Sequence, residues 1–167
     1  MPDALPLAED QLNEHSKIFA LALFSTHPSW REYAAMAAST DGDGMVLIVT
    51  VPAPESSRAE YPLTIDTDND EVTVGFDKYH SHFDWPSSDE GHGNPLCFID
   101  DIIKERTVVV SVWSGEKWAL STTLDASKSV DEISRIPDAA TVAKLRSWTG
   151  KYSRDEHLPL RDSKIGR

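Results

Sequence analysis

The stretch MVLIVTV, from Met45 to Val51, decides the fold of this chain. Every residue in it is apolar or β-branched, and it contains neither glycine nor proline. β-Branched side chains are stiff and suit the surface of a pleated sheet better than the surface of a helix. The stretch therefore predicts a buried β-strand.

Two further strands are predicted downstream of it. Residues 61–66 and 72–76 alternate apolar and polar side chains, and the turn sequence TDND lies between them at residues 67–70. Upstream, DGDG at residues 41–44 is a turn of the kind that joins a helix to a strand or two strands. Strands in this close succession predict an antiparallel meander.

Helices are predicted on both sides of the meander. Apolar side chains recur at helical spacing in residues 7–24, and a second short helix is expected at residues 30–38, after the break at Pro28. Asn94 and Pro95 suit the cap and the first position of a helix that runs to about residue 105.

The C-terminal part adds a hairpin, helices and a tail. Residues 107–113 and 117–123 are predicted strands around the turn sequence SGE. Residues 130–136 and 139–148 have helical spacing of apolar side chains. The polar segment 151–167 is expected to be poorly ordered unless it docks.

These elements predict an α+β fold, with helices packed on one face of a mainly antiparallel sheet of about five strands. A chain of 167 residues, of which 40% are hydrophobic, can bury the core of one domain. We therefore expect one domain over residues 1–150. Trp113, Trp118 and Trp148 are expected in its core.

Negative charge is concentrated in the middle of the chain. The formal net charge is −12, and residues 41–101 alone contain fourteen acidic and two basic side chains. A polyphosphate is bound by basic patches, so this charge argues against nucleic acid as a direct partner. A basic protein is the more plausible partner, although an acidic surface also simply keeps a protein soluble.

Cys97 is the only cysteine, which excludes an intramolecular disulfide and a thiolate cluster for zinc. The sequence has no apolar run of the roughly 18 residues that a membrane span requires, and its first residues lack the pattern of a secretory signal. We expect a cytoplasmic protein that does not bind membranes.

The segment GFDKYHSHFDW, at residues 75–85, contains the most distinctive side chains of the chain. His80, His82 and Asp84 alternate, so all three point to one side if the chain stays extended. Two imidazoles and a carboxylate suit zinc or iron, which makes this trio the candidate metal site. In a second interpretation the aromatic residues pack against the sheet and the histidines bond to backbone groups.

A third interpretation makes the same segment a contact surface. Tyrosine and tryptophan in polar loops are the residues that dominate binding energy at interfaces, and acidic residues surround them here. The predicted partner-binding residues are Asp77, Tyr79, His80, His82, Asp84, Trp85, Asp89 and Glu90.

The sequence contains no recognisable catalytic motif. Ser81, Ser87 and Ser88 lie near the histidines but not in a nucleophile elbow, and no glycine-rich phosphate loop follows a predicted strand. Cys97, between apolar neighbours, is expected to be a small core residue. We predict neither an enzyme nor a cofactor, and keep a metal-binding module or metal-dependent enzyme as the alternative.

The segment VTVGFDKYHSHFDW at residues 72–85, followed by FIDDI at residues 98–102 and the hairpin of Trp113 and Trp118, resembles the immunity proteins that accompany bacterial polymorphic toxins. The resemblance covers roughly residues 45–125 and assigns no role to any residue. It implies a cytosolic protein that binds and blocks a cognate toxin domain, commonly a nuclease or another enzyme acting inside the cell.

Overall fold

A computed structural model describes residues 4–88, 91 and 93–159. These residues group into two compact units. Unit 1 consists of Met1–Pro52, Pro62–Phe76 and His80–Asp100. Unit 2 consists of Ala53–Tyr61, Asp77–Tyr79 and Asp101–Arg167.

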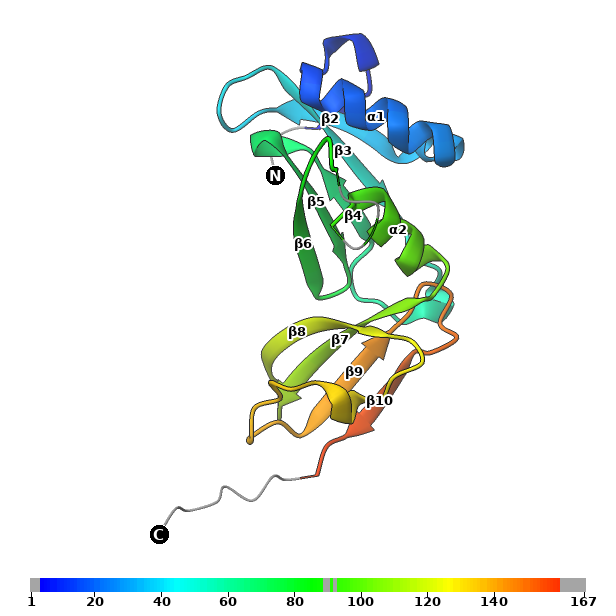
Figure 1. Ribbon diagram of the computed structural model, residues 1–167, viewed down its shortest axis with the longest axis vertical. Coiled ribbons are helices and arrows are strands. Elements are labelled where there is room, and N and C mark those ends of the chain that lie inside the picture. Colours follow the sequence, from blue (N-terminus) through cyan, green and yellow to red (C-terminus); the bar gives the residue numbers. More distant parts are fainter. Residues whose placement is uncertain (1–3, 89–90, 92, 160–167) are drawn as a thin grey trace. The chain divides into compact units, whose positions relative to one another are not determined.

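Unit 1 is built on a six-stranded sheet in which the strands follow one another in chain order (Figure 1). The strands are β1 (Leu5–Pro6), β2 (Ala34–Ala38), β3 (Met45–Val51), β4 (Leu63–Asp66), β5 (Glu71–Phe76) and β6 (Tyr79–Asp84). Neighbouring strands from β1 to β5 pair antiparallel. The predicted meander of three strands is confirmed and forms the middle of this larger sheet.

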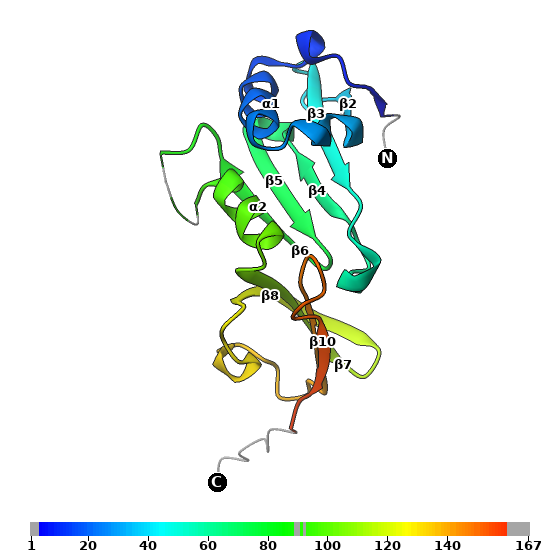
Figure 2. The same ribbon diagram turned by 90° about the vertical axis from the view of Figure 1, so that its right-hand side faces the viewer.

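The helices α1 (Glu14–Thr26) and α2 (Pro95–Ile103) lie on the same side of this sheet (Figures 1 and 2). The side chain of Asn13 caps α1 by accepting a hydrogen bond from the Ser16 amide at 2.9 Å. Phe19 and Leu23 of α1 are fully buried. Burying side chains of this size stabilises a fold by about 1.5–3 kcal/mol each.

Helix α2 begins as the sequence predicts. Asn94 Oδ1 accepts a hydrogen bond from the Leu96 amide at 2.9 Å, and Pro95 occupies the first helical position. Phe98 packs against Phe83 of β6, with 5.3 Å between the ring centroids. This contact fixes α2 on the covered face of the sheet.

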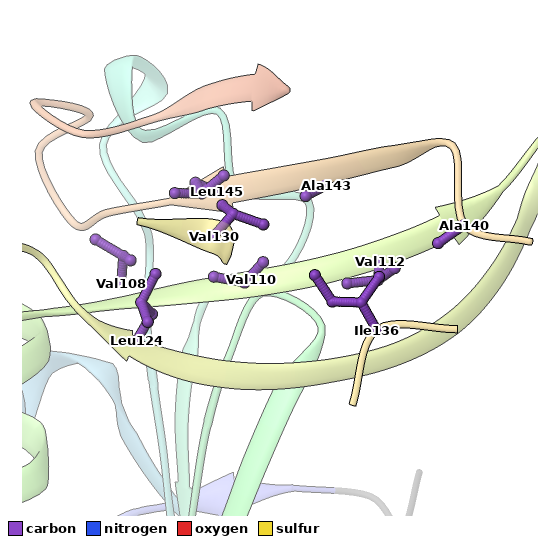
Figure 3. Packing of buried hydrophobic residues seen from close by; sticks show 9 residues of the cluster. All are labelled: Val108, Val110, Val112, Leu124, Val130, Ile136, Ala140, Ala143 and Leu145. Atoms are coloured by element: carbon purple, nitrogen blue, oxygen red, sulfur yellow. The ribbon is translucent and has the colours of Figure 1, made fainter. Parts of the chain in front are cut away.

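Unit 2 contains a four-stranded antiparallel sheet in the order β10-β9-β7-β8. Its strands are β7 (Thr107–Ser114), β8 (Lys117–Asp125), β9 (Val142–Arg146) and β10 (Arg154–His157). One face carries a cluster of buried apolar side chains, shown in Figure 3. The cluster consists of Val108, Val110, Val112, Leu124, Val130, Ile136, Ala140, Ala143 and Leu145.

The segment Ala53–Tyr61 joins unit 2 through the hairpin of β9 and β10. Ser153 Oγ donates a hydrogen bond to the Ser57 carbonyl at 2.7 Å. At Gly150, φ is +88°, and an added Cβ would lie 1.9 Å from the Ser56 carbonyl oxygen. Only glycine permits so close an approach of the two backbones.

Short 3₁₀ helices complete the structure: η1 (Glu9–Gln11), η2 (Pro28–Tyr33), η3 (Glu55–Ser57), η4 (Asp68–Asp70) and η5 (Val130–Glu132). Two of the helices predicted from the sequence are limited to these short 3₁₀ helices. The helix predicted at 30–38 is limited to residues 30–33, which belong to η2, because Ala34–Ala38 pairs with β3 and this pairing outweighs the helix propensity of alanine. The helix predicted at 130–136 is limited to the single turn η5.

The helix predicted at 139–148 is wrong. Val142–Arg146 is the strand β9, in which Ala143 and Leu145 are buried and Lys144 points to the opposite face. Over so few residues the apolar positions satisfy both periods, and pairing with β7 and β10 selects the strand. Within the segment predicted as a polar tail, Arg154–His157 forms β10.

The α+β class and the antiparallel pairing are confirmed, while the strands form two sheets rather than one of about five. None of the helices in the described part of the chain is long and apolar enough to cross a membrane.

Candidate partner-binding surface

The outer face of the unit 1 sheet, opposite α1 and α2, carries the histidines that the sequence singles out. Along β6, His80, His82 and Asp84 are exposed, whereas Phe83 is buried. The predicted alternation of these side chains is therefore confirmed. The two imidazole rings meet edge to face, with 5.4 Å between their centroids.

His82 is held in place by two side chains of β5. Its Nδ1 atom lies 3.0 Å from Thr73 Oγ1 and 3.2 Å from Glu71 Oε2. The side chains of His82 and Glu71 are 57% and 44% exposed, so solvent screens their interaction. The contact orients the imidazole without withdrawing it from a potential partner.

Asp66 extends this row onto β4, where it is the cross-strand partner of Thr73. It is half-buried and accepts a hydrogen bond from the Asp68 amide at 2.8 Å. Burial raises the pKa of Asp66 above its ordinary value, because removal from water disfavours the carboxylate.

Two acidic turns lie together at one end of the same sheet. The carboxylate of Asp68, in the β4–β5 turn, accepts hydrogen bonds from Ser39 Oγ and Thr40 Oγ1, both at 2.8 Å, in the β2–β3 turn. Burial opposes ionisation of Asp68, but these bonds outweigh it and hold the pKa below its ordinary value. Asp68 is therefore a structural link, whereas Asp41, Asp43 and Asp70 of the same two turns are exposed.

We define the acidic surface as the exposed turn residues together with the outer-face residues that they adjoin. It consists of Asp41, Asp43, Asp70, Glu71, His80, His82 and Asp84. By sequence, unit 1 contains fifteen acidic and two basic residues, a net charge of −13. Unit 2 contains thirteen acidic and fourteen basic residues, a net charge of +1. The negative charge of the protein thus belongs to unit 1.

The structure does not bring all the predicted contact residues together. The Asp77 carboxylate accepts a hydrogen bond from the Glu60 amide at 2.7 Å, and Tyr79, the first residue of β6, is half-buried. Trp85 packs edge-on against Phe19, with ring centroids 5.3 Å apart, and its indole nitrogen is buried. These contacts agree with the packing interpretation for Trp85. Asp89 and Glu90 lie outside the described residues.

The metal interpretation required a third ligand at a supporting distance. In the described ranges, no three side chains of histidine, cysteine, aspartate or glutamate gather closely enough to hold a metal ion, and this includes His80, His82 and Asp84.

Sequence reasoning missed four members of the acidic surface, Asp41, Asp43, Asp70 and Glu71. It also missed Thr73, which contacts His82, and Asp68, which links the two turns. Glu71 and Thr73 alternate with the buried Val72 and Val74, so strand periodicity could have placed them beside the histidines. The link made by Asp68 spans 29 residues of sequence and had no local signal.

Comparison of the chain with protein-family models, with curated proteins and with solved structures finds no match.

Proposed function

We propose that this chain is a cytoplasmic immunity protein that binds and neutralises a bacterial toxin domain with a basic surface, and that it has no catalytic activity of its own. The concentration of charge in unit 1, −13 against +1 in unit 2, carries this proposal. The resemblance of residues 45–125 to immunity proteins supplies the class of partner.

The charge favours association in two ways. A toxin that acts on nucleic acid presents a basic cleft, and an acidic surface accelerates encounter with such a cleft and matches its potential. Exposed carboxylates at the rim of an interface also keep part of their hydration in the complex, so pairing with a lysine or an arginine costs less desolvation there than in a fully buried ion pair. Asp41, Asp43 and Asp70 are exposed and so meet this condition.

The ordered part of the surface supplies specificity. Glu71 and His82 hold each other in one geometry, and His80 lies beside them. Side chains fixed in advance lose less conformational freedom on binding than mobile ones. An arginine of the partner can pair with the Glu71 carboxylate while its planar guanidinium stacks on an imidazole ring.

Affinity capture combined with growth rescue tests the proposal. The tagged chain is incubated with lysate of its native cell at low and high salt, and the retained proteins are identified by mass spectrometry. We expect a protein with a basic toxin domain that is retained at low salt and released by high salt. Coexpression of the chain should restore growth to cells that produce this domain. Retention without growth rescue would exclude the immunity role.

A matched pair of variants tests the surface. The combination Asp41→Asn, Asp43→Asn and Asp84→Asn should weaken binding of the captured domain about tenfold or more, and should reduce the salt dependence. The control combines Glu55→Gln, Glu116→Gln and Asp138→Asn, which neutralise three exposed acids of unit 2. Equal affinity of the acidic-surface variant and the control would assign binding to another part of the chain.

A further inference from the structure

Unit 2 carries two tryptophans side by side on the sheet face opposite its hydrophobic core. Trp113 of β7 and Trp118 of β8 are cross-strand partners. The register shifts between Val112 and Trp113, because Val112 pairs with Leu120 and Trp113 pairs with Trp118. The extra residue, Ala119, turns Trp118 away from the core and onto the face of Trp113.

Both indoles are held by the same kind of contact. Trp113 Nε1 donates a hydrogen bond to Ser111 Oγ at 3.0 Å, and Trp118 Nε1 donates one to Ser121 Oγ at 2.9 Å. Ser111 and Ser121 are themselves cross-strand partners. Trp118 nevertheless remains 56% exposed, which contradicts its expected place in the core. It is an oriented aromatic ring that presents its apolar surface to solvent.

Two lysines add positive charge to this face. Lys144 Nζ lies 4.3 Å from the centroid of the Trp113 ring, and Lys78 Nζ lies 5.7 Å from it. Lys78 also lies over the ring of Tyr61, at 4.4 Å, and pairs with Glu60 at 2.8 Å. Lys144 forms no salt bridge with any residue that the structure describes. Its ammonium is therefore available to an anion.

The positive charge of Lys144 already favours the ionised form of two carboxylic acids of this chain, Glu60 and Asp155. The pKa of Glu60 is lowered by its hydrogen bond with Lys78 and, to a smaller extent, by the charges of Lys78 and Lys144. Burial raises the pKa of Asp155, but hydrogen bonding to Arg146 and the nearby positive charges, Lys144 included, reverse this and lower it. A carboxylate brought by a partner would meet the same field.

We propose that this aromatic–lysine surface, formed by Tyr61, Lys78, Trp113, Trp118 and Lys144, binds an acidic segment of a partner protein. A carboxylate of the segment pairs with Lys144, and an apolar side chain next to it packs on the indole of Trp118. Tryptophan is enriched among the residues that dominate binding energy, and an indole already fixed by a hydrogen bond loses little freedom on binding.

The charge of the whole chain favours a peptide over nucleic acid as the anion. A polyphosphate brings a dense row of charges that the net charge of −12 repels. A segment with a few carboxylates next to apolar side chains satisfies Lys144 and Trp118 with less repulsion. This surface lies in unit 2, so the proposal is independent of the function proposed for unit 1.

Titration with defined probes tests this assignment on the full chain. The probes are a short synthetic peptide of alternating glutamate and phenylalanine, the same peptide with lysine in place of glutamate, and a short oligothymidylate. Amide and indole NMR signals report the binding site. We expect the acidic peptide alone to shift the indole signal of Trp118 and the signals around Lys144. Tighter binding of the oligothymidylate at these residues, or no shift with the acidic peptide, would overturn the proposal.

Variants separate the charge from the aromatic contact. Lys144→Glu and Trp118→Ala should each weaken binding of the acidic peptide about tenfold, whereas Lys144→Arg should retain it. Lys128→Glu is the matched control, because Lys128 is an exposed lysine of the same unit outside this surface. Circular dichroism confirms folding of each variant. An equal loss of affinity for the acidic peptide in Lys128→Glu and Lys144→Glu would show that net charge alone causes the effect. It would contradict binding at a specific surface.

Discussion

Unit 1 and unit 2 bury their sheets in the same way but expose different kinds of side chain. Each buries one face of an antiparallel sheet in an apolar core. The outer face of unit 1 carries Glu71, His82 and Asp84, whereas that of unit 2 carries Trp118 and Lys144. The core determines the architecture, and the alternate residues of the same strands are free to specify different partners.

The two units also differ in the contacts that hold their parts together. In unit 1, turns and a helix are joined by hydrogen bonds of short polar side chains, such as the contact of Ser16 with Thr67 at 2.6 Å. In unit 2, the segment Ala53–Tyr61 is held by a close approach of backbones at Gly150. Substitutions at these points therefore test the units separately.

The largest effect is expected for Gly150→Ala. Its Cβ would collide with the Ser56 carbonyl, and its φ of +88° disfavours any residue with a Cβ. We expect a loss of more than about 3 kcal/mol in the free energy of unfolding. Gly115→Ala is the control, because φ is +60° there but no atom lies within 4 Å of the added Cβ, so it should cost about 1 kcal/mol.

Hydrogen exchange resolved by segment shows where Gly150→Ala acts. If the two units are stabilised separately, β7 to β10 lose protection and β2 to β5 keep it. Equal loss of protection throughout the chain would show that it unfolds as a single cooperative unit and would contradict separate stabilisation of the two units.

A smaller loss is expected in unit 1 for Thr67→Val. The buried hydroxyl of Thr67 lies 2.6 Å from Ser16 Oγ and accepts a hydrogen bond from the Leu47 amide at 3.0 Å. Valine has the same shape but leaves these groups unsatisfied, at a cost of about 2–3 kcal/mol in urea denaturation. Thr64→Val, on an exposed position of β4, should change stability by less than about 0.5 kcal/mol. Similar values for both variants would contradict the structural role of Thr67.

Local patterns in the sequence predicted the elements that they determine by themselves. The strands around Met45–Val51, the cap of α2 and the outward alternation of His80 and His82 follow from period, propensity and short-range bonds. Strand β9 and the position of Trp118 depend on pairing with β7, and a register shift of one residue places the indole outside the core. No short window of sequence contains that information.

Asp68→Asn should change the pH dependence of stability. The pKa of Asp68 is lower in the folded state, so its ionised form stabilises unit 1 above the ordinary aspartate pKa of about 3.9, and this contribution is lost as the pH falls through the folded-state pKa. At neutral pH the variant should lose about 1–2 kcal/mol, and its difference from the parent should shrink in acid. Urea denaturation at both pH values measures this.

For Asp66→Asn we expect the opposite pH dependence of stability. Burial raises the pKa of Asp66, so its charge destabilises the folded state at neutral pH, and protonation relieves this cost as the pH falls through the raised pKa. The stability of the variant relative to that of the parent should therefore be highest at neutral pH. The same sign of pH dependence for both variants would contradict the assignment of the two carboxylates.

The smallest effect on stability is expected on the acidic surface itself, for Glu71→Gln combined with His82→Gln. The pair is about half exposed, and exposed ion pairs contribute little because water screens them and ordering the side chains costs entropy. We expect a change below about 0.5 kcal/mol in urea denaturation, together with weaker binding of the captured toxin domain. A loss above about 1 kcal/mol with unchanged binding would make these residues part of the scaffold. The first outcome would separate the surface that binds from the core that supports it.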